Sequence, residues 1–139
     1  MSQQLTLDRS SRTVVSRMEH VHLTVSDLER SIDWYERAFG MSVRWSDGTT
    51  AHVGTDRFYV AMTAHHGLPP SKGDRTGTAR IAHFAFTTPN LVAFTERLES
   101  EGIAQAGEAN RAEGDAIYLD DPDGNHIEVV GYIDGYIYA

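Results

Sequence analysis

The sequence predicts an α+β fold in which one strand–helix–strands unit is used twice. The first observation is the stretch HVHLTV, residues 20–25, where polar and apolar side chains alternate as they do along a strand with one core face. The second is a helical pattern directly after it, and the third is the return of both patterns 63 positions later, from His20 to His83. Each unit is too short to bury a good core alone, so we expect two sheets that curve around a shared cleft.

The first unit continues from its strand into a helix. Ser26 and Glu29 form an S-x-x-E capping box, and Gly40 is the expected end of the helix. Apolar side chains between these limits have helical spacing: Leu28, Ile32, Tyr35 and Phe39. Strands are expected at 41–46, 50–54 and 57–64, with the segment SDG as a turn between the first two.

The second unit repeats this order. The stretch RIAHFAFTT predicts a strand with His83 on one face and Phe84 and Phe86 on the other. A helix follows, with Thr88 as its cap, Pro89 in its first turn, Gly102 as its end and an apolar stripe of Leu91, Phe94 and Leu98. Strands are expected near 104–107, 115–120 and 126–132, and the segment DDPDGN is a turn by composition.

These patterns divide the chain into one domain and two short flanks. We expect a flexible N-terminal extension at 1–17, a single domain at 18–131 and a C-terminal tail at 132–139. Within the domain, module 1 covers 18–66, a loop covers 67–78 and module 2 covers 79–131. The tyrosine-rich tail is expected to pack on a partner subunit or to cover the cleft.

Composition excludes several classes of protein. The chain of 139 residues has a formal net charge of −8 and a pI of about 5.2, so nucleic acid is not an expected partner. No apolar run is long enough for a membrane span, and no secretory signal is present, so we expect no membrane partner. The absence of cysteine removes thiolate chemistry and fits a cytoplasmic protein.

Two histidines and one carboxylate form a candidate metal site. His20 and His83 occupy equivalent positions in the two units, and Glu128 stands in an otherwise apolar strand, where a buried carboxylate needs a cation or a hydrogen-bond partner. Such a set suits one divalent ion, Fe, Mn, Zn, Ni or Co, with positions left for water and substrate. The alternative for Glu128 is an ion pair with an arginine on a neighbouring strand.

Three segments of the chain have recognisable motifs: HVHLTVSDLERSIDWYERAFGM, AHFAFTT and AIYLDDPDGNHIEVV. Together they resemble the vicinal oxygen chelate superfamily, which includes glyoxalases, extradiol dioxygenases, fosfomycin-modifying enzymes and bleomycin-resistance proteins. The resemblance covers about residues 18–131. It implies two βαβββ modules that form a U-shaped, eight-stranded sheet, an incomplete barrel around a central cleft. It also implies that His20, His83 and Glu128 are the metal ligands of this family.

The chain departs from particular subfamilies at three places. The fourth ligand found in many metal-dependent members falls near Ala61, in a strand that has no Asp, Glu or His. Tyr118 matches a substrate-contacting tyrosine of extradiol dioxygenases, but the histidine expected a few residues earlier is missing. His22 stands where fosfomycin-type enzymes usually have a threonine, and their lysine-rich region is absent. Metal identity, substrate and reaction therefore stay open.

Other polar and aromatic side chains have weaker claims to a role. His22 has no equivalent in the second unit, where Ala85 takes its place. We expect it to act as an acid or base, to contact the substrate or to support another site residue, and the alternative is a solvated histidine without a role. Tyr118 is a candidate catalytic hydroxyl, and His126 a candidate substrate or supporting contact. Solvated loop positions are expected for His65 and His66, and core or dimer contacts for Trp34 and Trp45.

The resulting hypothesis is a divalent-metal enzyme of the glyoxalase or dioxygenase type, acting as a lyase, isomerase or ring-cleaving dioxygenase on a small oxygen-chelating substrate. We expect a homodimer. One alternative is a metal-free protein that sequesters a ligand, as bleomycin-resistance members do. Another is a dimeric accessory domain whose cleft is vestigial.

Overall fold

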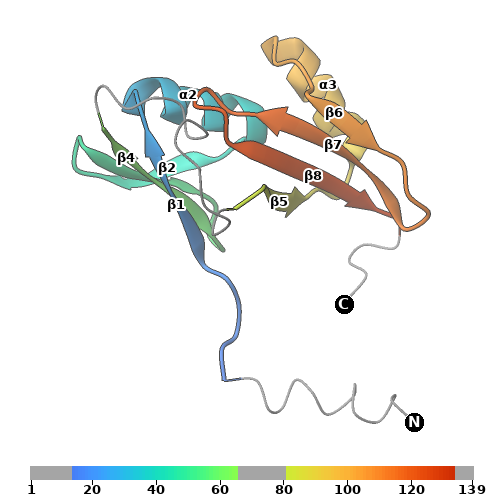
Figure 1. Ribbon diagram of the computed structural model, residues 1–139, viewed down its shortest axis with the longest axis horizontal. Coiled ribbons are helices and arrows are strands. Elements are labelled where there is room, and N and C mark those ends of the chain that lie inside the picture. Colours follow the sequence, from blue (N-terminus) through green and yellow to red (C-terminus); the bar gives the residue numbers. More distant parts are fainter. Residues whose placement is uncertain (1–13, 66–80, 134–139) are drawn as a thin grey trace.

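The computed structural model describes residues 14–65 and 81–133. Module 1 consists of β1 (His20–Val25), α2 (Leu28–Phe39), β2 (Ser42–Ser46), β3 (Thr50–Gly54) and β4 (Tyr59–Ala64). Module 2 consists of β5 (Phe84–Thr87), α3 (Leu91–Glu101), β6 (Gly107–Ala109), β7 (Gly114–Asp120) and β8 (His126–Tyr132). The two modules lie next to each other, with module 1 on the left of Figure 1 and module 2 on the right. The expected two-module α+β fold is confirmed.

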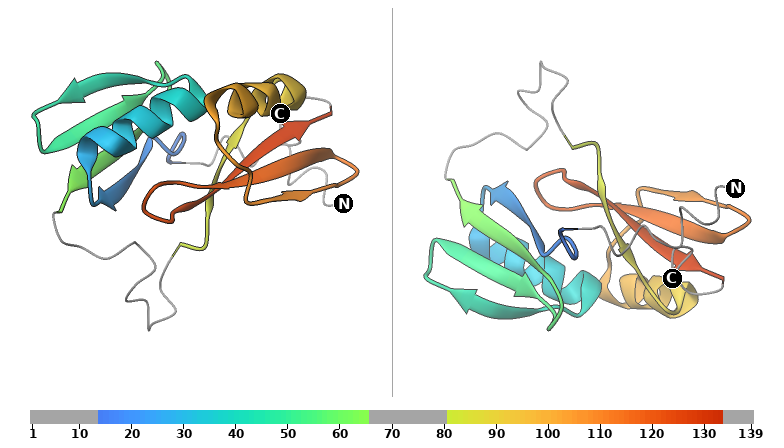
Figure 2. Two further views of the ribbon diagram at one scale, coloured as in Figure 1. Left: turned by 90° about the horizontal axis from the view of Figure 1, so that it is seen from above. Right: turned by 90° about the horizontal axis from the view of Figure 1, so that it is seen from below.

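Each module contains its own four-stranded mixed sheet with the same strand order. The orders are β1-β4-β3-β2 and β5-β8-β7-β6, and in each module the first strand pairs in parallel with the last. In the described part of the chain the two sheets are separate, so β1 and β5 are each an outer strand with one unpaired edge. The expected eight-stranded sheet is therefore not continuous among the described residues, and Figure 2 shows the two sheets as separate groups of strands.

The helix boundaries follow the predicted repeat, but the capping residues differ from the prediction. Asp27, not Ser26, caps α2 by accepting a hydrogen bond from the backbone N–H of Arg30. Asn90, not Thr88, caps α3 in the same way. Gly40 and Gly102 end the helices in the left-handed conformation, with φ of 71° and 69°, as expected.

Strand predictions were correct in position and shifted at their ends. The strand expected at 80–88 is shorter, so His83 lies just before β5, and the strand expected near 104–107 is β6 at 107–109. Of the two tryptophans, Trp34 is in the core with 8% of its surface exposed. Trp45 stands on β2 and is 48% exposed, so it is not a core residue, and a dimer contact stays the prediction for it.

One hydrophobic core spans both modules. It joins the apolar faces of the sheets to the helices, and its fully buried members include Tyr35, Met62, Leu98 and Ile127. Phe39 at the end of α2 contacts the rings of Phe86 and Phe94 from module 2, with centroids 5.0 and 5.8 Å apart. The two modules therefore share one core, as expected for units too short to bury a good core alone.

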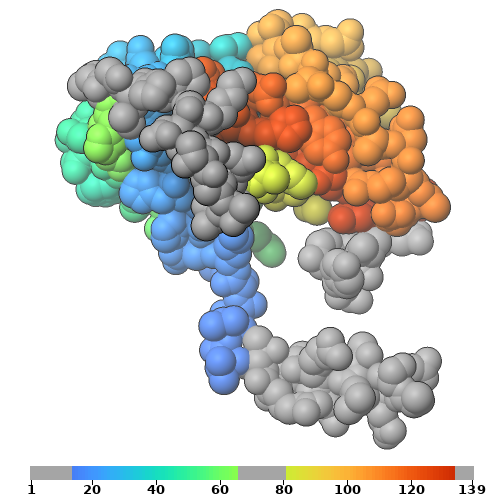
Figure 3. Space-filling view, viewed as in Figure 1, coloured from blue at the N-terminus to red at the C-terminus, as the bar shows by residue number. Residues whose placement is uncertain are grey.

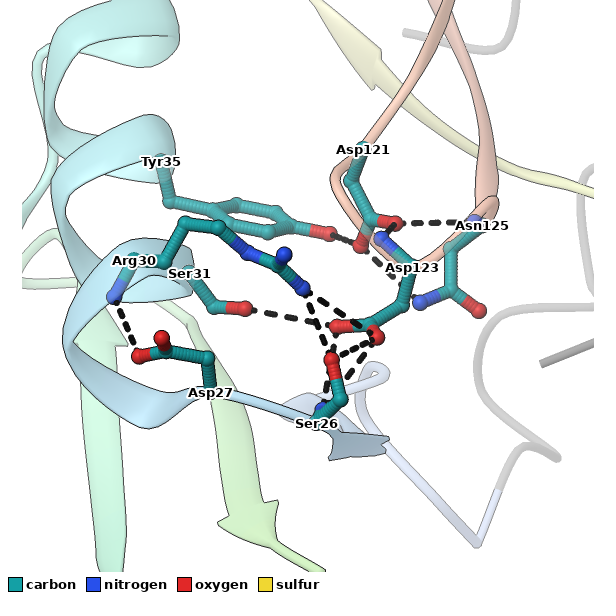
Figure 4. A network of polar contacts seen from close by, with 8 residues as sticks. All are labelled: Ser26, Asp27, Arg30, Ser31, Tyr35, Asp121, Asp123 and Asn125. Atoms are coloured by element: carbon teal, nitrogen blue, oxygen red, sulfur yellow. Dashed lines mark hydrogen bonds and ion pairs between the residues drawn. The ribbon is translucent and has the colours of Figure 1, made fainter. Parts of the chain in front are cut away.

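A buried polar network fixes the turn between β7 and β8 against α2 (Figure 4). The buried Tyr35 hydroxyl donates to Asp121 at 2.6 Å, and Asp123 accepts from the Ser26 hydroxyl at 2.6 Å. Arg30 lies 3.6 Å from Asp123. Burial, with the carboxylate of Asp121 next in effect, raises the pKa of Tyr35 well above its usual value. The DDPDGN turn of module 2 thus makes buried polar contacts with module 1.

The predicted extension, the loop and the tail fall mostly outside the described residues. That is also true of His66. The described segment that leads into β1 projects from the body of the molecule (Figure 3), and Val14 and Met18 in it are exposed. No helix among the described residues is long and apolar enough to cross a membrane.

Candidate functional site

The candidate residues lie on the sheet faces that point away from the core. On β1, His20 and His22 alternate with the core residue Leu23 and its neighbours, and they are paired across the ladder with Tyr59 and Ala61 of β4. In module 2, Glu128 of β8 is paired with Ala85 on one side and with Tyr118 on the other. His83 precedes Ala85 by two positions and so projects to the same face.

His83 and Glu128 are in contact. The Nε2 atom of His83 lies 3.1 Å from Oε1 of Glu128, whose side chain is 8% exposed. The other carboxylate oxygen accepts a hydrogen bond of 2.6 Å from Arg111, in the loop before β7. This hydrogen bond raises the pKa of the Arg111 guanidinium further above its usual value. The buried carboxylate therefore has an arginine partner within its own chain, as in the alternative expected for Glu128, although Arg111 stands in a loop and not on a neighbouring strand.

Tyr118 and His126 surround this pair. Their rings are stacked at a centroid distance of 5.1 Å, and each makes an edge contact with the His83 ring, at 6.1 and 6.3 Å. Nδ1 of His126 lies 2.7 Å from Asp120, which faces it across the β7–β8 ladder. The structure thus brings together four of the six predicted site residues in module 2.

The other two, His20 and His22, lie on the sheet of module 1. Nδ1 of His20 is 3.0 Å from Oε1 of Glu19, and its ring is stacked on Tyr59 at 4.6 Å with an interplanar angle of 8°. Nε2 of His22 is 2.7 Å from the hydroxyl of Thr63. His22 is exposed, so both its predicted acid–base role and the solvated alternative stay predictions.

The three proposed ligands are not assembled within one chain. Among residues 14–65 and 81–133, no group of three or more His, Asp or Glu side chains lies close enough to hold a metal ion. His83 and Glu128 supply two neighbouring donors, whereas His20 belongs to the other sheet. The part of the chain described here therefore contains two of the three expected ligands as a pair and the third as a separate residue.

Several residues of the site were not anticipated. Arg111 stands in a loop without periodicity, so no pattern in the sequence marks it. Glu19 could have been noticed, because it directly precedes His20 and is the nearest acceptor for that ring. Asp120 could also have been found, since residues 120 and 126 flank the predicted turn and hairpin pairing places them opposite each other.

The fold and the paired His–Glu face define a two-module protein of the glyoxalase type. Residues 17–129 match the family model described as Glyoxalase/Bleomycin resistance protein/Dioxygenase superfamily. The chain therefore belongs to this family, within the vicinal oxygen chelate superfamily that its motifs indicated.

Several similar proteins are matched over most of their own length. Over 123 residues it is 28% identical to glutathione transferase FosA of Serratia marcescens, covering 84% of this chain and 81% of the relative. It is 30% identical over 127 residues to lactoylglutathione lyase of Shigella flexneri, covering 82% and 91%. A crystal structure of a glyoxylase/bleomycin resistance protein/dioxygenase domain from Frankia sp. EAN1pec superposes with a TM-score of 0.70 at 25% identity, covering 89% and 97%. The named relatives are enzymes, a transferase and a lyase.

Proposed function

We propose that this protein is a divalent-metal-dependent enzyme of the glyoxalase or dioxygenase type, whose metal site is completed between two chains. His83 and Glu128 of one chain and His20 of a second chain would be the ligands. The substrate would be a small molecule that binds through one or two oxygen atoms. The observation that carries the proposal is the contact between Nε2 of His83 and Oε1 of Glu128.

The distance in this contact suits two ligands of one ion. Nitrogen and oxygen donors lie about 2.0–2.2 Å from a bound Zn²⁺, so two donors of one ion are about 3.0 Å apart at a right angle and about 3.4 Å apart at the tetrahedral angle. The measured separation is 3.1 Å. The hydrogen bond from Arg111 engages the second carboxylate oxygen and leaves Oε1 as the donor on the His83 side. Glu128 would then act as a ligand through one oxygen.

The free strand edges support a second chain as the source of His20. Among the described residues β1 in module 1 and β5 in module 2 are outer strands with one unpaired edge each, and such edges present backbone groups that readily accept another strand. If β1 of one chain lies along β5 of the other, His20 comes to the face that holds His83 and Glu128. A twofold axis repeats this arrangement, so a homodimer would contain two equivalent sites.

We propose a part in the chemistry for three residues around the site. A metal ion bound there would polarise substrate oxygens and favour negative charge on them. The Tyr118 hydroxyl and the His22 imidazole are groups that could donate or accept a proton at the substrate. His126, held by Asp120 at 2.7 Å, lines the same face and would contact the substrate from the strand that contains Glu128.

Metal analysis tests this proposal. Protein purified without chelator should contain about one divalent ion per chain, and His20→Ala, His83→Ala and Glu128→Ala should each lose most of it. His65→Ala is a matched control, because this exposed histidine lies outside the proposed site, and it should retain full metal content. Full metal content in the three ligand variants would show that the site is elsewhere.

A second candidate function is favoured by one observation. Arg111 already neutralises Glu128 at 2.6 Å, so the buried carboxylate needs no metal ion as a partner, as a ligand-sequestering protein would require. This alternative predicts no metal above background in the wild-type protein, together with tight binding of an aromatic or cationic compound in a calorimetric titration.

A further inference from the structure

The two twin histidines are held by different contacts. His83 directs Nε2 towards Glu128, whereas His20 directs Nδ1 towards Glu19. Within the described residues, Nε2 of His20 has no hydrogen-bond partner. We infer that Glu19 and Tyr59 are positioning residues, which hold the His20 ring in the Nδ1–H tautomer and leave the Nε2 lone pair available as a ligand. The inference that Nε2 binds a metal rests on the proposed function, whereas the inference about the tautomer of His20 does not.

The hydrogen bond decides the tautomer. An ionised carboxylate only accepts hydrogen bonds, so the ring nitrogen 3.0 Å from Oε1 of Glu19 must be the one that bears hydrogen. A neutral imidazole has one N–H, and the remaining nitrogen then has a free lone pair. Metal-binding histidines commonly donate the other N–H to a carboxylate, which fixes both tautomer and ring direction.

The stacked rings restrict the plane of the imidazole. Tyr59 lies against His20 at 4.6 Å, and on its other side it is stacked on His52 at 4.3 Å. His52 in turn contacts Trp45 at 4.9 Å, so one ring from each of four strands forms a row across the sheet. Rotation of His20 about its side-chain bonds would break this row at its end.

Glu19 links the hydrogen bond to the stack. Its Oε1 atom also accepts from the Tyr59 hydroxyl at 3.3 Å, and its backbone carbonyl accepts from the Tyr59 N–H at 3.3 Å. Desolvation, with the carboxylate of Glu19 next in effect, raises the pKa of the Tyr59 hydroxyl. Because the same oxygen contacts both rings, the carboxylate, the phenol and the imidazole hold one another in place.

Nitrogen NMR of the metal-free protein tests the inference directly. Long-range ¹H–¹⁵N spectra at about pH 8, above the usual histidine pKa of about 6.5, report which ring nitrogen of His20 bears hydrogen. We expect the Nδ1–H form in the wild type and a shift towards the Nε2–H form in Glu19→Ala. Glu29→Ala is the matched control, since it removes an exposed glutamate of the same module and should leave the spectrum of His20 unchanged. An Nε2–H tautomer in the wild type, or no change in Glu19→Ala, would overturn the inference.

Metal titration separates this inference from the proposed function. Glu19→Ala and Tyr59→Leu should each weaken metal binding by about 10- to 100-fold, whereas Tyr59→Phe keeps the stack and should weaken it less. If the wild type shows the Nδ1–H tautomer but binds no metal, the positioning is correct and the proposed function is wrong. If the wild type binds metal, and Glu19→Ala and Tyr59→Leu bind it with the same affinity as the wild type, the positioning role is wrong.

Discussion

Replacement of Tyr35 by Phe should destabilise the protein measurably, because it removes the hydroxyl that joins α2 to the β7–β8 turn. The hydroxyl is buried and donates to a carboxylate of Asp121 at 2.6 Å. Hydrogen bonds to charged groups contribute about 1.5–3 kcal/mol. Asp121 keeps donors from the backbone of Asp123 and from the backbone and side chain of Asn125, so its charge is not left unpaired. We therefore expect a loss of about 2 kcal/mol, in the lower part of that range.

Urea unfolding followed by circular dichroism at one fixed protein concentration measures this loss. With a urea dependence of about 2 kcal/mol per M, the midpoint should fall by about 1 M. Tyr118→Phe is the matched control, since no described residue hydrogen-bonds its hydroxyl, and its midpoint should be unchanged. A loss below about 0.5 kcal/mol in Tyr35→Phe would refute the role assigned to this network.

The same tyrosine makes stability depend on pH in a defined direction. Its pKa is raised in the folded protein, chiefly by burial, whereas in the unfolded chain it titrates near 10. The stabilising effect is therefore complete below pH 10 and decreases by about 1.4 kcal/mol per pH unit above it, up to the folded pKa. The difference in stability between wild type and Tyr35→Phe should be constant near about pH 8 and shrink above about pH 10. A difference that stays constant to about pH 11 would contradict the assigned environment.

Two further predictions concern the site and its supporting strand. Arg111→Met should weaken metal binding by about 10- to 100-fold in a chelator competition assay, because Oε2 of Glu128 loses its hydrogen-bond partner. Arg111→Lys should recover part of the affinity. Unchanged affinity in both would remove Arg111 from the site. Gly114→Ala should cost about 1–3 kcal/mol in urea unfolding, since φ is 151° and a Cβ would lie 2.3 Å from the carbonyl oxygen of Gly131. Gly107→Ala, whose Cβ would have its nearest neighbour at 3.8 Å, should cost less than about 0.5 kcal/mol, and equal losses would contradict the crowding.

Local sequence patterns were sufficient for most of the fold. The two helices begin at Leu28 and Leu91, which the repeat aligned, and each ends at the predicted glycine. The capping residues were wrong for a physical reason. Ser26 is a good cap by type, but its hydroxyl donates to Asp123, 97 positions further along the chain, so Asp27 caps the helix instead. Local patterns do not contain such a distant contact.

The candidate site was predictable to the extent that strand periodicity determines it. Alternation places Glu128 and His126 on one face of β8, and hairpin pairing places Tyr118 beside them. The relative position of the two sheets is determined by the core and by the buried network at the DDPDGN turn, which periodicity does not encode. For this reason the sequence could indicate which strand faces hold His20 and Glu128. It could not indicate that, among the described residues, the two side chains do not form a metal-binding group with His83.

Metal binding by mixed dimers tests the central claim most directly. His20→Ala and Glu128→Ala chains, unfolded and refolded together in equal amounts, should form about one half mixed dimers. Each mixed dimer would have one site with His20 from one chain and His83 and Glu128 from the other, and one site that lacks both replaced ligands. We predict about one quarter of the wild-type metal content in the mixture and almost none in either variant alone. A mixture that binds no more metal than the separate variants, under conditions where the wild type is loaded, would contradict a site shared between two chains.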